Sequence, residues 1–125
     1  MIYSGQLNIT VVSAVFKKDH DTFGKMDPYV TLTIGQSEFR TETKKGAGKT
    51  PSWNQNFTCF INGEQSMDIA AFDEDPGKDD LIGKDTISLA QVFQQKNVFQ
   101  NYPLYNKKKE QEGTVTIGLA FQPKV

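Results

Sequence analysis

Short runs of alternating apolar and polar residues recur along this chain, and they constrain its fold more than any other feature. Leu7, Ile9 and Val11 alternate with polar neighbours, and Met67 and Ile69 do the same further along the chain. An alternation of period two places one face of a segment in a core and the other face in solvent. The pattern therefore predicts β-strands, since amphipathic helices need a period near 3.6 residues.

The spacing of these runs predicts a fold made almost entirely of β-strands. Asn62-Gly63 is a strong turn signal, and Pro103 favours an edge position for its strand. Only the stretch Ala90 to Lys96 is compatible with a helix, and that helix is short. We expect an all-β, eight-stranded antiparallel Greek-key β-sandwich with at most one short helix. The expected strands cover residues 7–11, 29–34, 38–43, 53–61, 67–71, 87–89, 101–105 and 114–121.

Composition narrows the class of protein. The 125 residues suit a single domain, 1–125, and the net charge of −1 argues against nucleic-acid binding. The one cysteine, Cys59, excludes an internal disulfide and suits a reducing compartment; its apolar neighbours predict that it is buried. No stretch is apolar enough for a signal peptide or a membrane span. We expect a cytoplasmic monomer that binds at the membrane surface as a peripheral protein and does not cross the bilayer.

Eight of the fifteen acidic residues fall in two short stretches, each between two expected strands. Carboxylates held together repel, by roughly 4 kcal/mol for a pair at ~4 Å and an effective dielectric constant of ~20. A fold that brings both stretches to one end therefore needs a cation there. Oxygen donors without His or Cys partners favour Ca²⁺ over Zn²⁺. The acids are Asp19, Asp21 and Asp27 in the first stretch, and Asp73, Glu74, Asp75, Asp79 and Asp80 in the second.

An EF-hand is the rival calcium motif, and the spacing excludes it. A loop counted from Asp73 has Lys78 at its sixth position and Lys84 at its twelfth, where Gly and Glu are required. A loop counted from Asp19 has Val30 at its twelfth position.

Several ordered motifs resemble one known family. At the segment Asp27-Pro28-Tyr29-Val30, and in motifs spread over roughly Leu7 to Leu89, the chain resembles the C2 domain, a calcium-dependent phospholipid-binding β-sandwich. Because the chain opens on the Leu7 strand and closes on the strand 114–121, it resembles the circularly permuted form of that fold. The resemblance is carried by Leu7–Ala14, Asp21–Val30, Thr41 and Thr43, Pro51–Phe57, Phe72–Asp75 and Asp79–Gly83.

The resemblance implies a set of ligands for two or more Ca²⁺ ions. The third loop is one residue shorter than the commonest family spacing, so either Asp79 or Asp80 supplies its last ligand. Asp80 is preferred because it directly precedes Leu81-Ile82-Gly83. The implied ligands are the carboxylates of Asp21, Asp27, Asp73, Asp75 and Asp80 (or Asp79), with the main-chain carbonyls of His20 and Glu74.

Residues near these loops are candidates for contact with lipid. Phe23 and Met26 lie in a polar loop, where they either insert among lipid chains or pack locally under the loop; Phe23 is the favoured inserter. Basic groups near an anionic leaflet each contribute about 1 kcal/mol, although the same residues also suit an ordinary solvated face. The candidates are Phe23, Lys25, Met26, Arg40, Lys44, Lys45 and Lys78.

The function expected from these features is calcium-dependent binding to anionic phospholipid, of the phosphatidylserine or phosphoinositide kind, in a signalling role. Two alternatives remain open. One is a calcium-independent protein-interaction module, and the other is the targeting domain of a larger signalling enzyme. The lone His20 has no Ser or Cys partner at triad spacing, so the sequence does not predict an enzyme.

Overall fold

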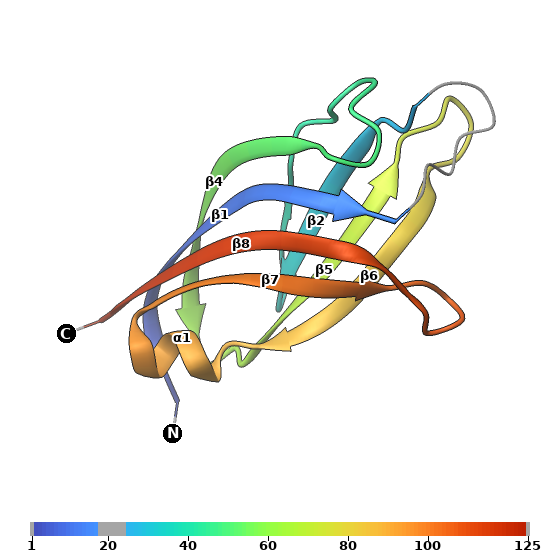
Figure 1. Cartoon of the computed structure of the whole chain (residues 1–125). Coiled ribbons are helices and arrows are strands. Elements are labelled where there is room, and N and C mark those ends of the chain that lie inside the picture. The colour runs from blue at the N-terminus through green and yellow to red at the C-terminus, as the bar shows by residue number, and fades with distance from the viewer. Residues whose placement is uncertain (1, 18–24, 125) are drawn as a thin grey trace.

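The computed structural model describes residues 2–17 and 25–124. Eight antiparallel strands and one short helix follow one another in these ranges, as the alternation predicts (Figure 1). The elements are β1 (Ser4–Phe16), β2 (Pro28–Ile34), β3 (Ser37–Arg40), β4 (Ser52–Asn62), β5 (Ser66–Asp73), β6 (Asp80–Ser88), α1 (Ala90–Gln95), β7 (Asn97–Tyr105) and β8 (Gln111–Pro123).

The strands form two layers that face each other across the core. Their pairing order is β3-β2-β5-β6-β7-β8-β1-β4, and Figure 1 shows β4, β1, β8 and β7 lying in front of β2, β5 and β6. A single register pair, Lys84 with Tyr105, joins β6 to β7. At this sparse junction the sheet passes from one layer to the other, which makes the fold a β-sandwich.

Inward-facing apolar side chains of both layers fill the core. Leu7 and Ile9 of β1 and Leu32 of β2 have no exposed surface, and Ile69 and Ile117 are equally enclosed. Each such burial stabilises the fold by about 1.5–3 kcal/mol relative to exposure. Most core residues are those that the alternation of period two marks as inward, and Met26 and the helix residues Val92 and Phe93 add to them.

Cys59, which the sequence predicts to be buried, and Trp53 both belong to the core. Cys59 is 3% exposed within the core, as its apolar neighbours indicate. Trp53 is buried too, and its indole Nε1 donates a hydrogen bond to the main-chain oxygen of Glu42 at 2.8 Å. This bond fastens the segment after β3 to the start of β4 and so shapes the loop between them.

Several strand boundaries differ from the prediction, and local features account for three of them. β7 begins at Asn97 rather than at residue 101. The prediction missed its first residues because the exposed Gln100 interrupts the apolar alternation. β6 begins at Asp80 rather than at residue 87. The prediction missed its first part because the charged Asp85 interrupts the apolar alternation. β3 ends at Arg40 because the Thr41 hydroxyl accepts a hydrogen bond from Val30 N, in place of a further strand pair.

A glycine makes the close approach of β6 to β7 possible. A Cβ atom at Gly83 would lie 3.0 Å from the Cβ of Leu104 and 3.3 Å from the backbone of β7. We therefore expect Gly83→Ala to push the two layers apart and to destabilise the fold by about 1–3 kcal/mol. Urea denaturation measures this loss. Gly77→Ala, in open space, serves as the control and should leave the unfolding midpoint unchanged.

Candidate metal centre

The register of the strands brings the second acidic stretch beside the start of β2. Pro28, the first residue of β2, pairs with Asp73 at the end of β5, and Asp73 also pairs with Asp80 at the start of β6. Three strand ends thus form one row at one end of the sandwich. The loop between β3 and β4 reaches the same end, because Gly48 N donates to Met26 O at 3.0 Å.

Three carboxylates meet in this row. One oxygen from each of Asp73, Asp75 and Asp80 lies within 4.8 Å of the others. Asp73 has no exposed surface, whereas Asp80 is exposed at the rim. The grouping follows from local geometry, since Asp73 ends β5, Asp75 follows two residues later, and Asp80 is the register partner of Asp73.

The cluster has the chemistry of a site for a hard divalent cation. Three negative charges at this separation repel, by about 3 kcal/mol per pair at an effective dielectric constant of ~20. All three donors are carboxylate oxygens, which Ca²⁺ prefers. The donor set therefore fits Ca²⁺, and the remaining ligands of a six- to eight-coordinate ion must come from neighbouring loops or solvent.

Asp27 is tied to the cluster through its backbone. Its N–H donates to Asp73 Oδ1 at 2.9 Å, and its carbonyl accepts from Glu74 N at 2.9 Å. The Asp27 carboxylate itself accepts from the backbone N–H of Gly46 at 2.6 Å. Asp27 thus holds the loops before β2 and after β3 beside the cluster, and its side chain lies against the second of these loops.

Asp79 is held by a tyrosine rather than by the cluster. Its Oδ2 accepts a hydrogen bond from the Tyr29 hydroxyl at 2.5 Å, and its Oδ1 accepts from Asp75 N at 3.2 Å. The hydrogen bond from Tyr29 lowers the pKa of Asp79. Burial of the tyrosine, followed by its hydrogen bond to Asp79 and the negative charge of Asp79, raises the pKa of Tyr29 to about 12. Of the two candidates for the last ligand, Asp80 is the one that lies with Asp73 and Asp75.

The side chain of Glu74 binds the basic residues of the neighbouring loop. It accepts hydrogen bonds from Thr43 and from Arg40, the latter at 2.9 Å, and lies 3.7 Å from Lys45 Nζ. The Arg40 guanidinium also stacks over the Tyr29 ring, 3.7 Å from its centroid. These contacts connect the cluster end of β5 to β3 and its following loop through opposite charges.

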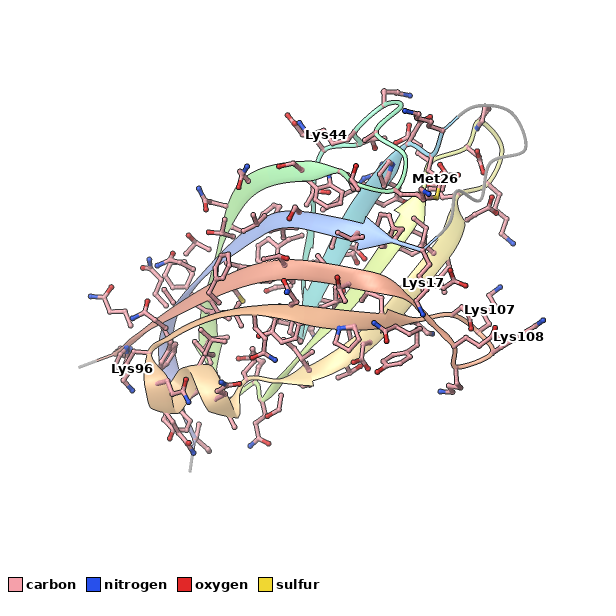
Figure 2. All side chains as sticks on the ribbon, viewed as in Figure 1. Lys17, Met26, Lys44, Lys96, Lys107 and Lys108 are labelled. Carbon is pink, nitrogen blue, oxygen red and sulfur yellow. The ribbon has the colours of Figure 1, made fainter. Side chains whose placement is uncertain are left out.

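The other basic candidates differ in how they are engaged. Lys44 pairs with Glu42 at 3.2 Å, whereas Lys25 and Lys78 are exposed beside the acidic end. Figure 2 shows Lys44 near Met26 at this end, and Lys96 at the opposite end of the sandwich. Cationic side chains therefore border the acidic cluster.

Met26 does not lie at the surface. It has no exposed area and belongs to the hydrophobic core, so the expectation that it contacts lipid is wrong and the alternative of local packing holds. The reason is the bond from Gly48 N to Met26 O, which draws the segment before β2 under the β3–β4 loop. Asp19, Asp21, His20 and Phe23 lie outside the described residues.

Sequence reasoning missed two groups that shape the cluster. Tyr29 positions Asp79, and Gly46 N–H binds the Asp27 carboxylate. Tyr29 was assigned only to the motif that begins β2, and nothing in the spacing indicates that its hydroxyl reaches a loop 50 residues away in sequence. Gly46 has a φ of 68°, and its glycine identity was the one available signal of a tight turn.

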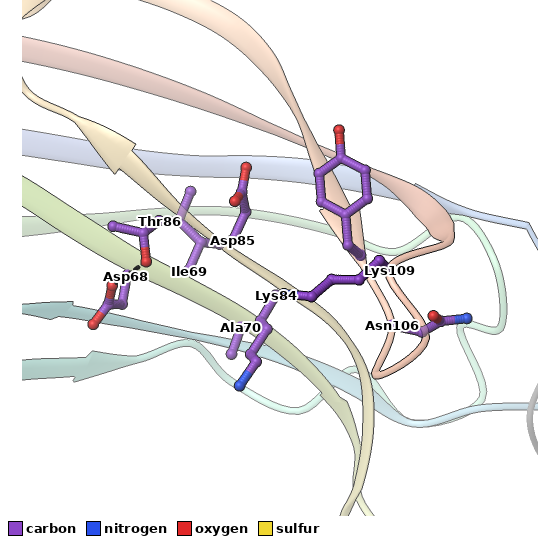
Figure 3. Close-up of a pocket in the computed structure, with 9 residues that line it drawn as sticks. Asp68, Ile69, Ala70, Lys84, Asp85, Thr86, Asn106 and Lys109 are labelled. Carbon is purple, nitrogen blue, oxygen red and sulfur yellow. Dashed lines mark hydrogen bonds between the residues drawn. The ribbon is translucent and has the colours of Figure 1, made fainter.

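A separate hollow lies away from the cluster, along β5, β6 and the turn after β7 (Figure 3). Its volume is about 610 Å³, and it is lined by residues of both charges, among them Asp68, Asp85, Lys84 and Lys109. Asp68 accepts a hydrogen bond from Thr86 at 2.5 Å. The mixed charges here form no catalytic arrangement, so the acidic end remains the candidate site.

Among the described residues, no helix is long and apolar enough to cross a membrane.

Comparison with known proteins identifies the family. A family model described as the C2 domain matches residues 5–104. The 16 kDa phloem protein 2 of Arabidopsis thaliana is 33% identical over 121 residues, which are 95% of this chain and 82% of that protein. A calcium-dependent lipid-binding protein of the same organism is 35% identical over 82 residues, 63% of this chain and 16% of that protein. A calcium-bound structure of two C2 domains of Extended-Synaptotagmin 2 matches with a TM-score of 0.83 and 26% identity, over 96% of this chain and 46% of that chain.

The chain therefore belongs to the C2 domain family, and it has the β-sandwich fold of that family. The C2 domain is a non-catalytic module. The motifs between residues 7 and 89 predicted this membership from the sequence.

The hydrogen bond between Tyr29 and Asp79 can be tested by measuring the pKa of the Asp79 carboxyl group. Tyr29→Phe removes the hydroxyl, so the pKa of Asp79 should rise toward its ordinary value of about 3.9. A pH titration of the Asp79 carboxyl carbon by NMR measures the shift. Tyr105→Phe, at the end of β7, is the matched control. An unchanged Asp79 pKa in Tyr29→Phe would refute the bond.

The burial of Met26 predicts a loss of stability rather than a loss of lipid contact. Met26→Ala should lower the free energy of unfolding by about 2–5 kcal/mol, because it leaves a cavity in the core. Denaturant unfolding measures this, and vesicle binding by the folded fraction should stay at the wild-type level. The neighbouring exposed Lys25→Ala should change stability by less than about 0.5 kcal/mol.

Proposed function

We propose that this C2 domain binds Ca²⁺ at the acidic end and thereby docks on anionic phospholipid membranes. The observation that carries the proposal is the meeting of Asp73, Asp75 and Asp80 within 4.8 Å at a shared row of strand ends. Three carboxylates at this separation are costly without a cation and suitable ligands with one.

The proposed ligand set extends the cluster into the adjoining loops. Asp75 and Asp80 offer carboxylates toward the rim, and the buried Asp73 forms the floor. Asp27 lies next to them and joins after giving up its bond from Gly46 N. Two or more ions are proposed, with Asp79 as the alternative to Asp80. The set is completed by the Asp21 carboxylate and the main-chain carbonyls of His20 and Glu74. The assignment of these three ligands rests on the family resemblance.

The proposed mechanism is an electrostatic switch. In the ion-free state the clustered carboxylates repel anionic lipid, since like charges meet at the rim. Bound Ca²⁺ supplies positive charge and coordination positions that a phosphate or carboxylate oxygen can fill. Lys25 and Lys78 stand exposed at the same end and add attraction to an anionic leaflet.

The other proposed lipid contacts depend on exchange of ion pairs. Arg40 and Lys45 bind Glu74, and Lys44 binds Glu42. Such exposed ion pairs are worth about 0–1 kcal/mol, so a phosphate group can replace the acidic partner. Phe23 is the proposed inserting side chain. Lipid headgroups of the phosphatidylserine or phosphoinositide kind offer the anions that these groups require.

The comparisons support calcium and lipid as ligands. The related Extended-Synaptotagmin 2 structure is described as calcium bound, and a relative from Arabidopsis thaliana is called a calcium-dependent lipid-binding protein. We carry both properties to this chain as part of the proposal. From this proposal it follows that the protein is cytoplasmic and is recruited to the membrane when calcium rises.

We also propose that the chain has the permuted C2 topology. The proposal rests on the family resemblance, in which the strand that other members place first comes last; the pairing of β1 with β8, from Gly5–Pro123 to Phe16–Gly113, occurs in either strand order.

The ion site is tested by removing two of the clustered charges. Asp75→Asn with Asp80→Asn should lower calcium affinity at least about tenfold and abolish calcium-dependent sedimentation with phosphatidylserine vesicles. The fold should persist, because the change removes repulsion. Calorimetric titration and vesicle co-sedimentation measure the two effects. Asp85→Asn, which removes a β6 charge outside the cluster, is the control.

Three outcomes would contradict the proposal. Equal vesicle binding in chelator and in calcium would remove the calcium dependence. The absence of any binding heat with calcium would favour the protein-interaction alternative. Unfolding of the double variant would make these acids structural. Vesicle binding should also weaken as salt rises, because exposed charges are screened within about 10 Å at 0.1 M.

A further inference from the structure

The central part of the outer face of the layer β4-β1-β8-β7 carries no charged side chain, and the structure describes all residues of this part. Figure 1 shows these four strands side by side. Within the ranges given below, every second residue points outward, and none of these residues is Asp, Glu, Lys, Arg or His. The outward series run from Asn54 to Asn62, from Gln6 to Thr10, from Thr114 to Gln122 and from Asn97 to Tyr105. We call this the neutral face.

The lack of charge is specific to this face. Charged residues make up 23% of the chain, close to the ~25% that is usual for a globular domain. The outer face of the other layer follows this norm, with Glu38, Arg40, Asp68 and Lys84 at outward positions. A shortage of charge in the chain as a whole therefore does not explain the neutral face.

Cross-strand hydrogen bonds hold the polar side chains of the neutral face against the sheet. Thr10 donates to Asn56 at 2.6 Å, and Thr58 donates to Asn8 at 3.0 Å. These bonds link β1 to β4 side chain by side chain. Because the side chains are already ordered, covering them costs less conformational entropy than covering free lysines or glutamates.

The neutral face also presents an aromatic ring beside a recess. Phe99 is 73% exposed and lies over Gly118, where an added Cβ would be 3.3 Å from the ring. A hollow of about 380 Å³ adjoins it, lined by Asn8, Thr10 and Ala120 among others. Phe60, 75% exposed, stands on β4 at the far edge of the same face. Exposed aromatics amid uncharged groups are typical of interface centres, where Lys, Glu and Asp are depleted.

We propose that the neutral face is a homodimer interface, in which two copies of this chain pack face to face about a two-fold axis. In such an interface a surface meets itself, so a charge near the axis would meet its own like charge. The neutral face avoids this cost. Its ring and recess lie in one patch, as a two-fold interface requires, so Phe99 of each copy can enter the recess of the other.

The dimensions of the face set the strength of the dimer. Four strands spaced ~4.8 Å apart and about nine residues long at ~3.3 Å each give a footprint of roughly 570 Å². A stable interface buries about 800 Å² per partner, so the dimer is weak and depends on concentration. Dilute protein is then the monomer that the sequence suggests, and dimers form at high micromolar concentration.

Sedimentation equilibrium in calcium chelator, from about 5 to about 500 µM protein, tests the proposal independently of the calcium site. The wild type should pass from monomer to dimer and stop there. Phe99→Lys should weaken association at least tenfold, because two lysines then face each other across the axis. Thr33→Lys, an equal charge change on the outer face of the other layer, is the control and should associate like the wild type.

A mixing experiment distinguishes self-association through this face from loss of fold. Phe99→Lys and Phe99→Asp should each be monomeric and retain the wild-type melting temperature, and an equimolar mixture should recover association. A wild type that stays monomeric at 500 µM would overturn the proposal. Growth beyond dimers, or equal weakening by Thr33→Lys, would overturn it as well.

Discussion

The buried carboxylate of Asp73 is the contact on which the rest of the acidic end depends. It has no exposed surface, and its Oδ1 accepts the backbone N–H of Asp27 at 2.9 Å. A second bond, from Glu74 N to the carbonyl of Asp27, runs between the same two segments in the opposite direction. Burial of an ionised carboxylate is costly unless hydrogen bonds or opposite charge offset it. One group thus joins β5 to the entry of β2 and also belongs to the acidic cluster, so fold and candidate site share a single constraint.

The acids of the β5–β6 loop divide into two sets because of what surrounds them. Asp73, Asp75 and Asp80 face one another, whereas Glu74 and Asp79 are turned to partners outside the cluster. Glu74 binds the cationic loop after β3, and Asp79 accepts the Tyr29 hydroxyl, over whose ring Arg40 stacks. The two outward acids hold the neighbouring loops in place around the other three.

The sequence predicted the strands, the acidic end and the family, because each depends on local pattern or on short motifs. It failed where a contact links segments distant in sequence. The burial of Met26 follows from a backbone bond to Gly48, and the position of Asp79 follows from Tyr29. It also failed where a single polar residue interrupts an alternation, as Gln100 does in β7. The neutral face needed the register of four strands, since no one strand reveals which residues share a surface.

The acidic end and the neutral face are oriented so that both can act together. The cluster lies at the strand ends, whereas the neutral face runs along the strands, so neither surface covers the other. In a face-to-face pair, an axis parallel to the strands turns both acidic ends to the same side. If the acidic end docks on a membrane as proposed, the second end would meet that membrane at the effective concentration that the first contact sets, which would strengthen weak binding without a new contact. Sheets packed face to face keep their strands within about 30°, and a parallel axis satisfies this rule. A weak dimer and a weak lipid contact would therefore reinforce each other, since each raises the local concentration that the other needs.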